Sequence, residues 1–168
     1  MMKQSADIDI KTFKFKDDGS IPNHPSYPLL VYKNVLTAKD DPTNILAKNN
    51  WLGVWRGSVF PYHHYHSNSH EVLVVIRGSG LLQLGGKLGA KITVQQGDAM
   101  ILPAGFGHRL IGGSIDFEVI GAYPNGQKYD FCTGDPNERS KNLENIRKVP
   151  LPDNDPLFGE NGPLFTYW

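Results

Sequence analysis

The chain has 168 residues, a length that suits one domain able to bury a hydrophobic core without disulfides or a structural metal. Its 17 Lys and Arg residues balance 17 Asp and Glu residues without any basic block or stripe, so nucleic acid is not expected as a partner. The single cysteine, Cys132, cannot form an internal disulfide, and no apolar N-terminal run predicts a signal peptide or a membrane span, so a cytoplasmic location is expected.

Short apolar runs separated by glycines and prolines predict an all-β fold, a barrel or a sandwich. In chain order, strands are expected at residues 8–16, 29–35, 51–62, 72–76, 81–84, 92–94, 99–102 and 115–122. Two short peripheral helices are also expected. Asp41-Pro42 and Asp135-Pro136 each place an N-cap residue before a proline suited to the first helical position. These helices would end at about Asn49-Asn50 and Lys148.

The run at residues 72–76 is apolar on both faces, unlike a strand with one face in water. Something must therefore cover its outer side. Either the N-terminal strand and the C-terminal extension do so, or a second subunit does, which would make the protein a homodimer. The tail at residues 150–168 carries several large apolar side chains and is expected to dock on the β-structure rather than to be disordered.

Four of the six histidines fall within eight consecutive residues, and a fifth, His108, follows in a segment rich in Gly and Pro. Imidazoles beside a carboxylate are the usual protein ligands of a borderline transition-metal ion. His64 and His66 are two residues apart, so on a strand both rings point to the same face. Glu71 has the wrong parity for one unbroken strand, but the turn chemistry of residues 67–69 would let it begin the next strand and face the imidazoles.

The other two histidines of the cluster have less defined roles. By alternation His63 points away from His64, which favours a structural or second-shell role over ligation. His70 would take the place of Glu71 under a shorter turn and could replace or supplement it as a ligand. Glu71 is preferred because a carboxylate offsets the charge of the ion and because it starts the next strand.

Some further side chains neighbour the expected ligands in sequence or in strand position and are candidates for a pocket near the metal. They are Arg56, Tyr62, Tyr65, Gln83, Phe106 and Arg109. Each taken alone also has an ordinary structural explanation. His24, between two prolines, is expected to be exposed and inert, and Cys132 to be a buried, unreactive thiol.

The spacing of these residues resembles the two motifs of the cupin superfamily. The first motif is matched by His64-Tyr65-His66, Glu71 and Gly78, and the second by Gly97, Pro103, Gly105 and His108. Ser58 and Gly112 depart from the usual glycine and asparagine, and neither is a ligand position. The stretch from Tyr62 to Leu73 and the ending from Gly162 to Trp168 are further similar to the YjlB-like bacterial cupins.

This resemblance implies an RmlC-like jelly roll, a double-stranded β-helix barrel. The whole chain, residues 1–168, would be one cupin domain. Its core barrel would occupy about residues 29–122, with the N-terminal strand, the C-terminal helix and the tail packed on it.

The resemblance also implies one divalent metal ion inside the barrel, bound by His64, His66, Glu71 and His108. A set of three histidines and one glutamate favours Fe or Mn, with Ni or Zn as further options. The expected function is that of a metal-dependent enzyme acting on a small molecule, with dioxygenase-type chemistry favoured over isomerase-type chemistry. The alternative is a non-catalytic cupin that binds or senses a small molecule.

Overall fold

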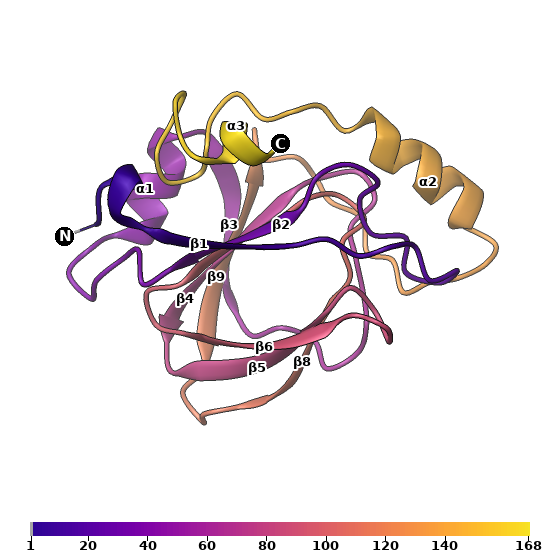
Figure 1. Cartoon of the computed structure of the whole chain (residues 1–168), viewed down its shortest axis with the longest axis horizontal. Helices are drawn as coiled ribbons and strands as arrows, with labels where there is room; N and C mark the ends of the chain where they lie inside the picture. Colours follow the sequence, from indigo (N-terminus) through magenta and orange to yellow (C-terminus); the bar gives the residue numbers. More distant parts are fainter. Residues whose placement is uncertain (1) are drawn as a thin grey trace.

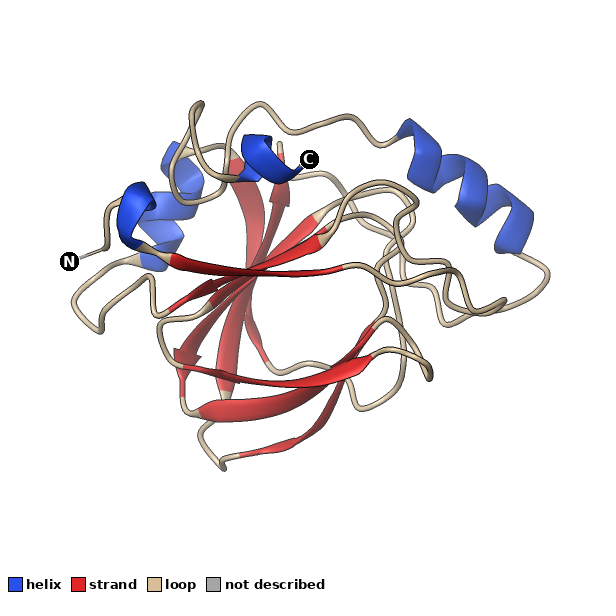
Figure 2. Ribbon diagram, in the orientation of Figure 1, coloured by secondary structure: helices blue, strands red, loops and turns tan. Residues whose placement is uncertain are grey.

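The computed structural model describes residues 2–168, which form two antiparallel β-sheets facing each other (Figure 1 and Figure 2). The six-stranded sheet has the order β1-β2-β7-β4-β9-β3, and the three-stranded sheet has the order β6-β5-β8. The strands are β1 (Asp9–Phe13), β2 (Leu29–Lys33), β3 (Trp51–Gly57), β4 (Glu71–Arg77), β5 (Ser79–Leu84), β6 (Ala90–Gln95), β7 (Ala99–Leu102), β8 (His108–Gly113) and β9 (Glu118–Pro124).

The helical elements are short and lie at the periphery (Figure 2). They are a 3-10 turn (Ser5–Asp7), α1 (Pro42–Lys48), α2 (Arg139–Lys148) and α3 (Leu164–Tyr167). Across the described residues, none of these helices has the length and apolar character needed to cross a membrane.

The expected all-β jelly roll is confirmed, but the barrel is not closed. The two sheets remain separate ladders and form a sandwich. One reason is that β3 ends at Gly57, whereas the sequence predicts a strand that continues to Tyr62. The chain then crosses toward the smaller sheet as an irregular segment, in which Pro61 has no N–H with which to extend a ladder.

Two other predicted boundaries shift for local reasons. The strand predicted from Ile115 begins at Glu118, because Ile115 occupies a turn and is fully exposed. Helix α2 begins at Arg139, because the Asp135 carboxylate accepts from the N–H of Asn137, 2.9 Å away, and holds a turn there instead of capping the helix.

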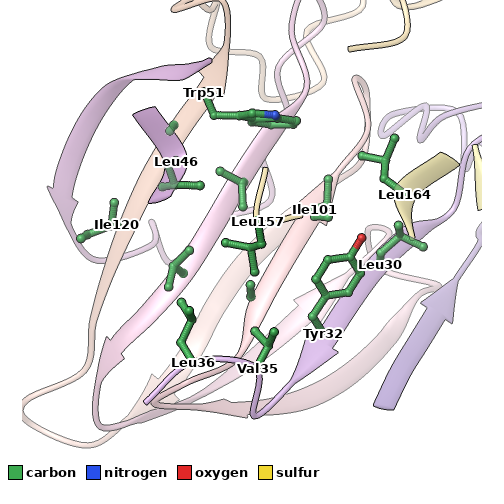
Figure 3. Packing of buried hydrophobic residues seen from close by; sticks show 14 residues of the cluster. Leu30, Tyr32, Val35, Leu36, Leu46, Trp51, Ile101, Ile120, Leu157 and Leu164 are labelled. Carbon is green, nitrogen blue, oxygen red and sulfur yellow. The ribbon is translucent and has the colours of Figure 1, made fainter. Parts of the chain in front are cut away.

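Strand β4 separates the two halves of the hydrophobic core. Its Leu73 and Val75 face the cluster between the two sheets, whereas Val72 and Val74 face an outer cluster. The outer cluster contains side chains from β2, α1 and the C-terminal tail, among them Leu30, Tyr32, Leu46, Leu157 and Leu164 (Figure 3). The chain's own tail therefore covers the outer face, which was the first of the two explanations for this apolar strand.

A buried carboxylate fastens the tail to the sheet. Asp155 is fully buried and accepts a hydrogen bond of 2.5 Å from the Tyr32 hydroxyl. It also accepts from the backbone N–H groups of Leu157, Phe158 and Leu164, at 2.9, 3.0 and 3.1 Å. Burial raises the pKa of the Asp155 carboxyl, and these hydrogen bonds offset part of that effect. The tail thus depends on one acceptor that satisfies four donors.

Replacing this acceptor should loosen the tail. In Asp155→Ala, the Tyr32 hydroxyl and three backbone N–H groups lose their partner inside the protein, so the free energy of unfolding should fall by about 3 kcal/mol. Urea denaturation measures the change. Asp153→Ala removes an exposed carboxylate from the same loop and should change it by less than about 0.5 kcal/mol. Equal effects of the two substitutions would contradict the role of Asp155.

Candidate metal centre

The segment that carries the first two candidate ligands is held along both of its edges. On one side, the backbone of His64 pairs with that of His108, with N–O distances of 3.2 and 3.0 Å. On the other side, Tyr65 and Cys132 exchange two backbone hydrogen bonds of 2.9 Å each. His108 is the first residue of β8, so this pairing brings a residue of the smaller sheet beside His64.

The candidate carboxylate arrives from the opposite sheet. Glu71 is the first residue of β4 and shares the inward face with Leu73. Its Oε1 lies 3.4 Å from Nε2 of His66 and 3.5 Å from Nε2 of His108. These three buried residues could hold a metal ion, because their candidate ligand atoms all lie within 4.8 Å of one another. His64 is not a member of this trio, although its ring centroid is 4.1 Å from that of His108.

In His64, His66 and His108, a backbone carbonyl oxygen lies within hydrogen-bond distance of Nδ1. Nδ1 of His64 lies 2.9 Å from the oxygen of Tyr62, that of His108 lies 3.1 Å from the oxygen of Phe106, and that of His66 lies 2.5 Å from the oxygen of Asp130. A carbonyl oxygen only accepts, so Nδ1 must carry the proton in each ring. In the neutral imidazole, Nε2 then carries no proton, and its lone pair is free to bind a metal ion.

The Glu71 carboxylate is held by a hydrogen bond on one side only. Its Oε2 accepts from the Tyr123 hydroxyl at 2.6 Å, and that hydroxyl accepts from the Trp55 indole N–H at 2.7 Å. Its Oε1 is buried and has no hydrogen-bond partner in the described part of the chain. This orphaned oxygen points between the two Nε2 atoms of the trio.

The electrostatics of the trio favour a positive charge between its members. Burial raises the pKa of the Glu71 carboxyl, but His66 and His108 outweigh it and hold this pKa well below its usual range. Burial likewise lowers the pKa of His66, yet the Glu71 carboxylate raises it overall. Burial, with His108 nearby, lowers the pKa of His64 to about 3, so this ring is neutral at pH 7. A proton or a metal ion at Nε2 of His66 would offset the buried negative charge of Glu71.

His70 lies away from the trio and has the opposite tautomer. Its Nδ1 accepts from the N–H of Ala104 at 2.9 Å, so Nε2 must carry the proton that it donates to the oxygen of Pro150 at 3.1 Å. The ring packs against Trp168, with 4.7 Å between centroids. Both nitrogens of His70 are thus occupied by backbone groups outside the site.

His24 lies near the ring of His70, with 6.4 Å between centroids, and the expectation that it is exposed was wrong. Its ring is buried and stacks on Tyr27, with 4.3 Å between centroids. Its Nδ1 accepts from the N–H groups of Ser26 and Tyr27, at 3.0 and 2.8 Å. The imidazole thus accepts hydrogen bonds from the turn that follows it and packs against Tyr27, so it is buried although prolines stand on both sides.

The remaining candidates lie at different depths around the site. His63 is half-buried and faces a surface hollow on another side, together with Asp18 and Lys87. Tyr62 is exposed and stacks on Phe60, with 5.3 Å between centroids. Phe106 is buried in the cluster between the sheets and contributes only its carbonyl to the orientation of His108.

The two candidate arginines are engaged by other side chains or backbone. Arg56 lines the mouth of the cavity at the site and pairs with Glu118 at 3.1 Å. Arg109 donates through Nε to Gln83 at 3.0 Å and through Nη1 to the oxygen of Pro61 at 3.3 Å. Gln83 therefore links β5 to β8 within the smaller sheet and does not line the cavity. Tyr65 is likewise buried behind the site, where its hydroxyl accepts from Asn142 at 3.1 Å.

Several residues of the site were missed in the sequence. A cavity of about 510 Å³ opens onto His64 and the trio, and Tyr123, Tyr129 and Phe131 contribute to its walls. Tyr123 lies on β9. Tyr129 and Phe131 come from the segment whose Cys132 pairs with Tyr65. The alternation of Tyr129 and Phe131 about a polar residue was a signal that these two rings share a face.

Comparisons with known proteins agree with this geometry. A Cupin domain model matches residues 51–117, which include His64 and the trio. The "uncharacterized protein YjlB" of Bacillus subtilis (strain 168) is 49% identical over 158 residues, 94% of this chain and 96% of that protein. The chain belongs to the cupin superfamily. The resemblance seen in the two sequence motifs is thereby confirmed, including that to the YjlB-like cupins.

The cupin is also similar to solved structures. The WlaRB TDP-quinovose 3,4-ketoisomerase of Campylobacter jejuni has a TM-score of 0.44 at 15% identity, with 83% of this chain and 98% of that chain covered. Pumpkin seed globulin has a TM-score of 0.36 at 24% identity, with 46% of this chain covered. The cupin spans 22% of that globulin chain.

His70 should make the stability of the cupin depend on pH. Burial lowers the pKa of its imidazole to about 3 in the folded protein, whereas the unfolded ring titrates near 6.5. The unfolded chain therefore binds this proton first, so the stabilisation is complete above about pH 6.5 and is lost as the pH falls toward 3. At pH 5 the loss due to His70 should be about 2 kcal/mol.

Urea denaturation of the wild type and of His70→Gln at pH 8 and pH 5 measures this contribution. Glutamine can accept from Ala104 and donate to Pro150 without titrating in this range. The wild type should lose about 2 kcal/mol more than the variant between the two pH values. Parallel losses in the two proteins would show that His70 is not the titrating group.

Proposed function

We propose that this cupin is a metal-dependent enzyme acting on a small molecule, with one divalent ion held by His64, His66, Glu71 and His108. The observation that carries the proposal is the orphaned Oε1 of Glu71. This buried oxygen has no hydrogen-bond partner within the described residues, and it faces the Nε2 atoms of His66 and His108, whose rings carry a proton on Nδ1. Leaving such an oxygen unpaired is costly, and a cation offsets that cost.

The donor types fit such an ion. Three neutral imidazoles and one carboxylate leave a divalent ion with a net charge of about +1, and the set favours Fe or Mn, with Ni or Zn as further options. His64 is assigned as the fourth ligand because its protonated Nδ1 leaves Nε2 free and its ring packs against His108. An ion bound here would supply Lewis-acid or oxygen-activating chemistry to a substrate in the adjoining cavity.

The chain's own residues would orient the site and exclude water. Tyr123 holds Oε2 of Glu71, and burial together with the nearby carboxylate raises the pKa of Tyr123, so its hydroxyl stays protonated and donates. Backbone carbonyls hold the planes of the imidazoles. The ligand residues are almost fully buried, so bulk water has little access to them.

Oxidation of the dioxygenase type is favoured over isomerisation within this proposal. An isomerase needs a general acid or base beside the substrate. With the histidines and Glu71 occupied by the ion, the other titratable side chains along the described cavity walls are those of Tyr123, Tyr129 and Arg56. Arg56 is paired with Glu118, and Tyr123 already donates to Glu71. Of this set, Tyr129 alone is left for proton transfer.

Substitution of the ligands should abolish metal uptake. We expect His66→Ala, His108→Ala and Glu71→Gln to lose the ion that the wild type retains, because each removes a donor from the buried set. His64→Ala should lose it as well or bind it at least about tenfold more weakly. Elemental analysis of protein purified without an affinity tag measures the metal content per chain.

His63→Ala is the matched control for these variants. It removes a histidine adjacent to His64 whose side chain faces another hollow, so its metal content should equal that of the wild type. Circular dichroism would establish that the variants are folded. A ligand variant that is folded and keeps the full metal content would refute the assignment of that residue.

Turnover separates an enzyme from a binding protein. The metal-loaded cupin should consume oxygen or form product with at least one member of a panel of diketones, phenols, thiols and sugars, and His108→Ala should not. Oxygen-electrode traces and product analysis measure both. Binding of a panel member without turnover by the loaded wild type would support a non-catalytic binding or sensing cupin instead.

A further inference from the structure

Three exposed aromatic side chains, Phe60, Tyr129 and Phe131, line the cavity, and a fourth, Tyr62, packs against Phe60. Phe60, Tyr62, Tyr129 and Phe131 are between 41% and 51% exposed. Phe60 contacts both Phe131 and Tyr62, with 5.3 Å between ring centroids in each pair. We call these four residues the aromatic wall. Large aromatic rings left together in water at the mouth of a cavity are typical of a ligand-binding surface.

The aromatic wall continues inward to the candidate ligands. Phe131 stacks on the ring of His64, with centroids 5.1 Å apart and planes 18° apart. Tyr129 meets His66 edge to face at 4.8 Å and stacks on Tyr123 at 4.2 Å. Aromatic side chains thus extend along the cavity from its exposed part to the imidazoles.

The protein side chains along this path offer an anion no free positive charge. Among the described residues that line the cavity, Arg56 is the sole Arg or Lys. Its guanidinium is already paired with Glu118, through Nη2 at 3.1 Å and Nε at 3.3 Å. The carboxylate of Glu71 lies at the inner end. A phosphate or diphosphate would thus find no unpaired cation from the protein along these walls.

The inner part of the aromatic wall is held in place before any ligand arrives. Asp130 lies between Tyr129 and Phe131, and its carboxylate accepts from the N–H of Ser67 at 2.7 Å and from the Ser67 hydroxyl. Its own N–H donates to the Asn68 side chain at 3.0 Å. These bonds tie the segment to the stretch that carries His66, so little conformational freedom remains to be lost on binding.

We infer that the cavity takes a neutral, planar aromatic or conjugated small molecule. Its ring lies against Phe60, Tyr129 and Phe131. An oxygen atom of the molecule that can bind the metal ion, its oxygen donor, points toward Glu71 and the imidazoles. The volume of about 510 Å³ suits a molecule of one or two rings. This inference deepens the proposed function and rests on it for the role of the oxygen donor.

Two probes separate the aromatic wall from the metal. Catechol has a ring and two oxygen donors, whereas acetohydroxamic acid has two oxygen donors and no ring. We expect Phe131→Ala and Phe131→Leu to weaken catechol binding to the Mn²⁺-loaded protein roughly tenfold. The same substitutions should change acetohydroxamic acid binding by less than about twofold, because that probe does not need the ring. Isothermal titration calorimetry measures both affinities.

Controls make each outcome decisive. Tyr167→Ala removes an equally exposed aromatic ring from α3 and should leave both affinities unchanged. Catechol binding that is indifferent to Phe131 while acetohydroxamic acid binds normally would overturn the inference and spare the proposed function. Tighter binding of a nucleoside diphosphate than of catechol would also overturn it.

A measurement without metal tests the inference even if the proposed function is wrong. Quenching of tryptophan fluorescence by catechol, in protein treated with a chelator, reports binding to the aromatic wall alone. Weaker quenching in Phe131→Leu than in the wild type would support the inference even if acetohydroxamic acid binds to neither protein. Equal quenching in the two proteins would contradict it.

Discussion

A buried carboxylate facing two imidazole nitrogens is the constraint on which this end of the sandwich depends. Removing a charge from water costs several kcal/mol unless nearby groups offset it. Glu71 receives one hydrogen bond, from Tyr123, and its other oxygen depends on whatever lies between His66 and His108. The local fold supplies the rest of the geometry, since backbone carbonyls keep the ring protons on the side away from the carboxylate. Sheet pairing, tautomer and charge therefore specify one site together.

Much of this site could be predicted from the sequence because its first half is local. Parity along a strand placed His64 and His66 on one face and separated them from His63. The turn chemistry after His66 explained how Glu71 could begin a new strand with an inward carboxylate. Both expectations use distances of a few residues, over which backbone geometry is nearly independent of the rest of the chain.

The other half of the site depends on pairings between residues far apart in the sequence. Tyr129 and Phe131 reach the cavity because Cys132 pairs with Tyr65, and no local pattern predicts that contact. The open sandwich follows from an irregular crossing that was predicted as strand. His24 was predicted wrongly for a similar reason, since its ring stacks on Tyr27, which in turn stacks on Trp168 from the distant C-terminal tail.

The cover over the outer face of the larger sheet has a consequence for biosynthesis. Strand β9 ends at Pro124, and the tail that shields Val72 and Val74 comes later in the chain. At typical rates of translation, the 44 residues that follow Pro124 take roughly 2 to 9 s to synthesise. During that interval the outer face of the nascent sheet lacks the apolar side chains of the C-terminal tail that later cover it. A chaperone that holds this surface would have seconds in which to act, and premature termination would leave a protein prone to aggregate.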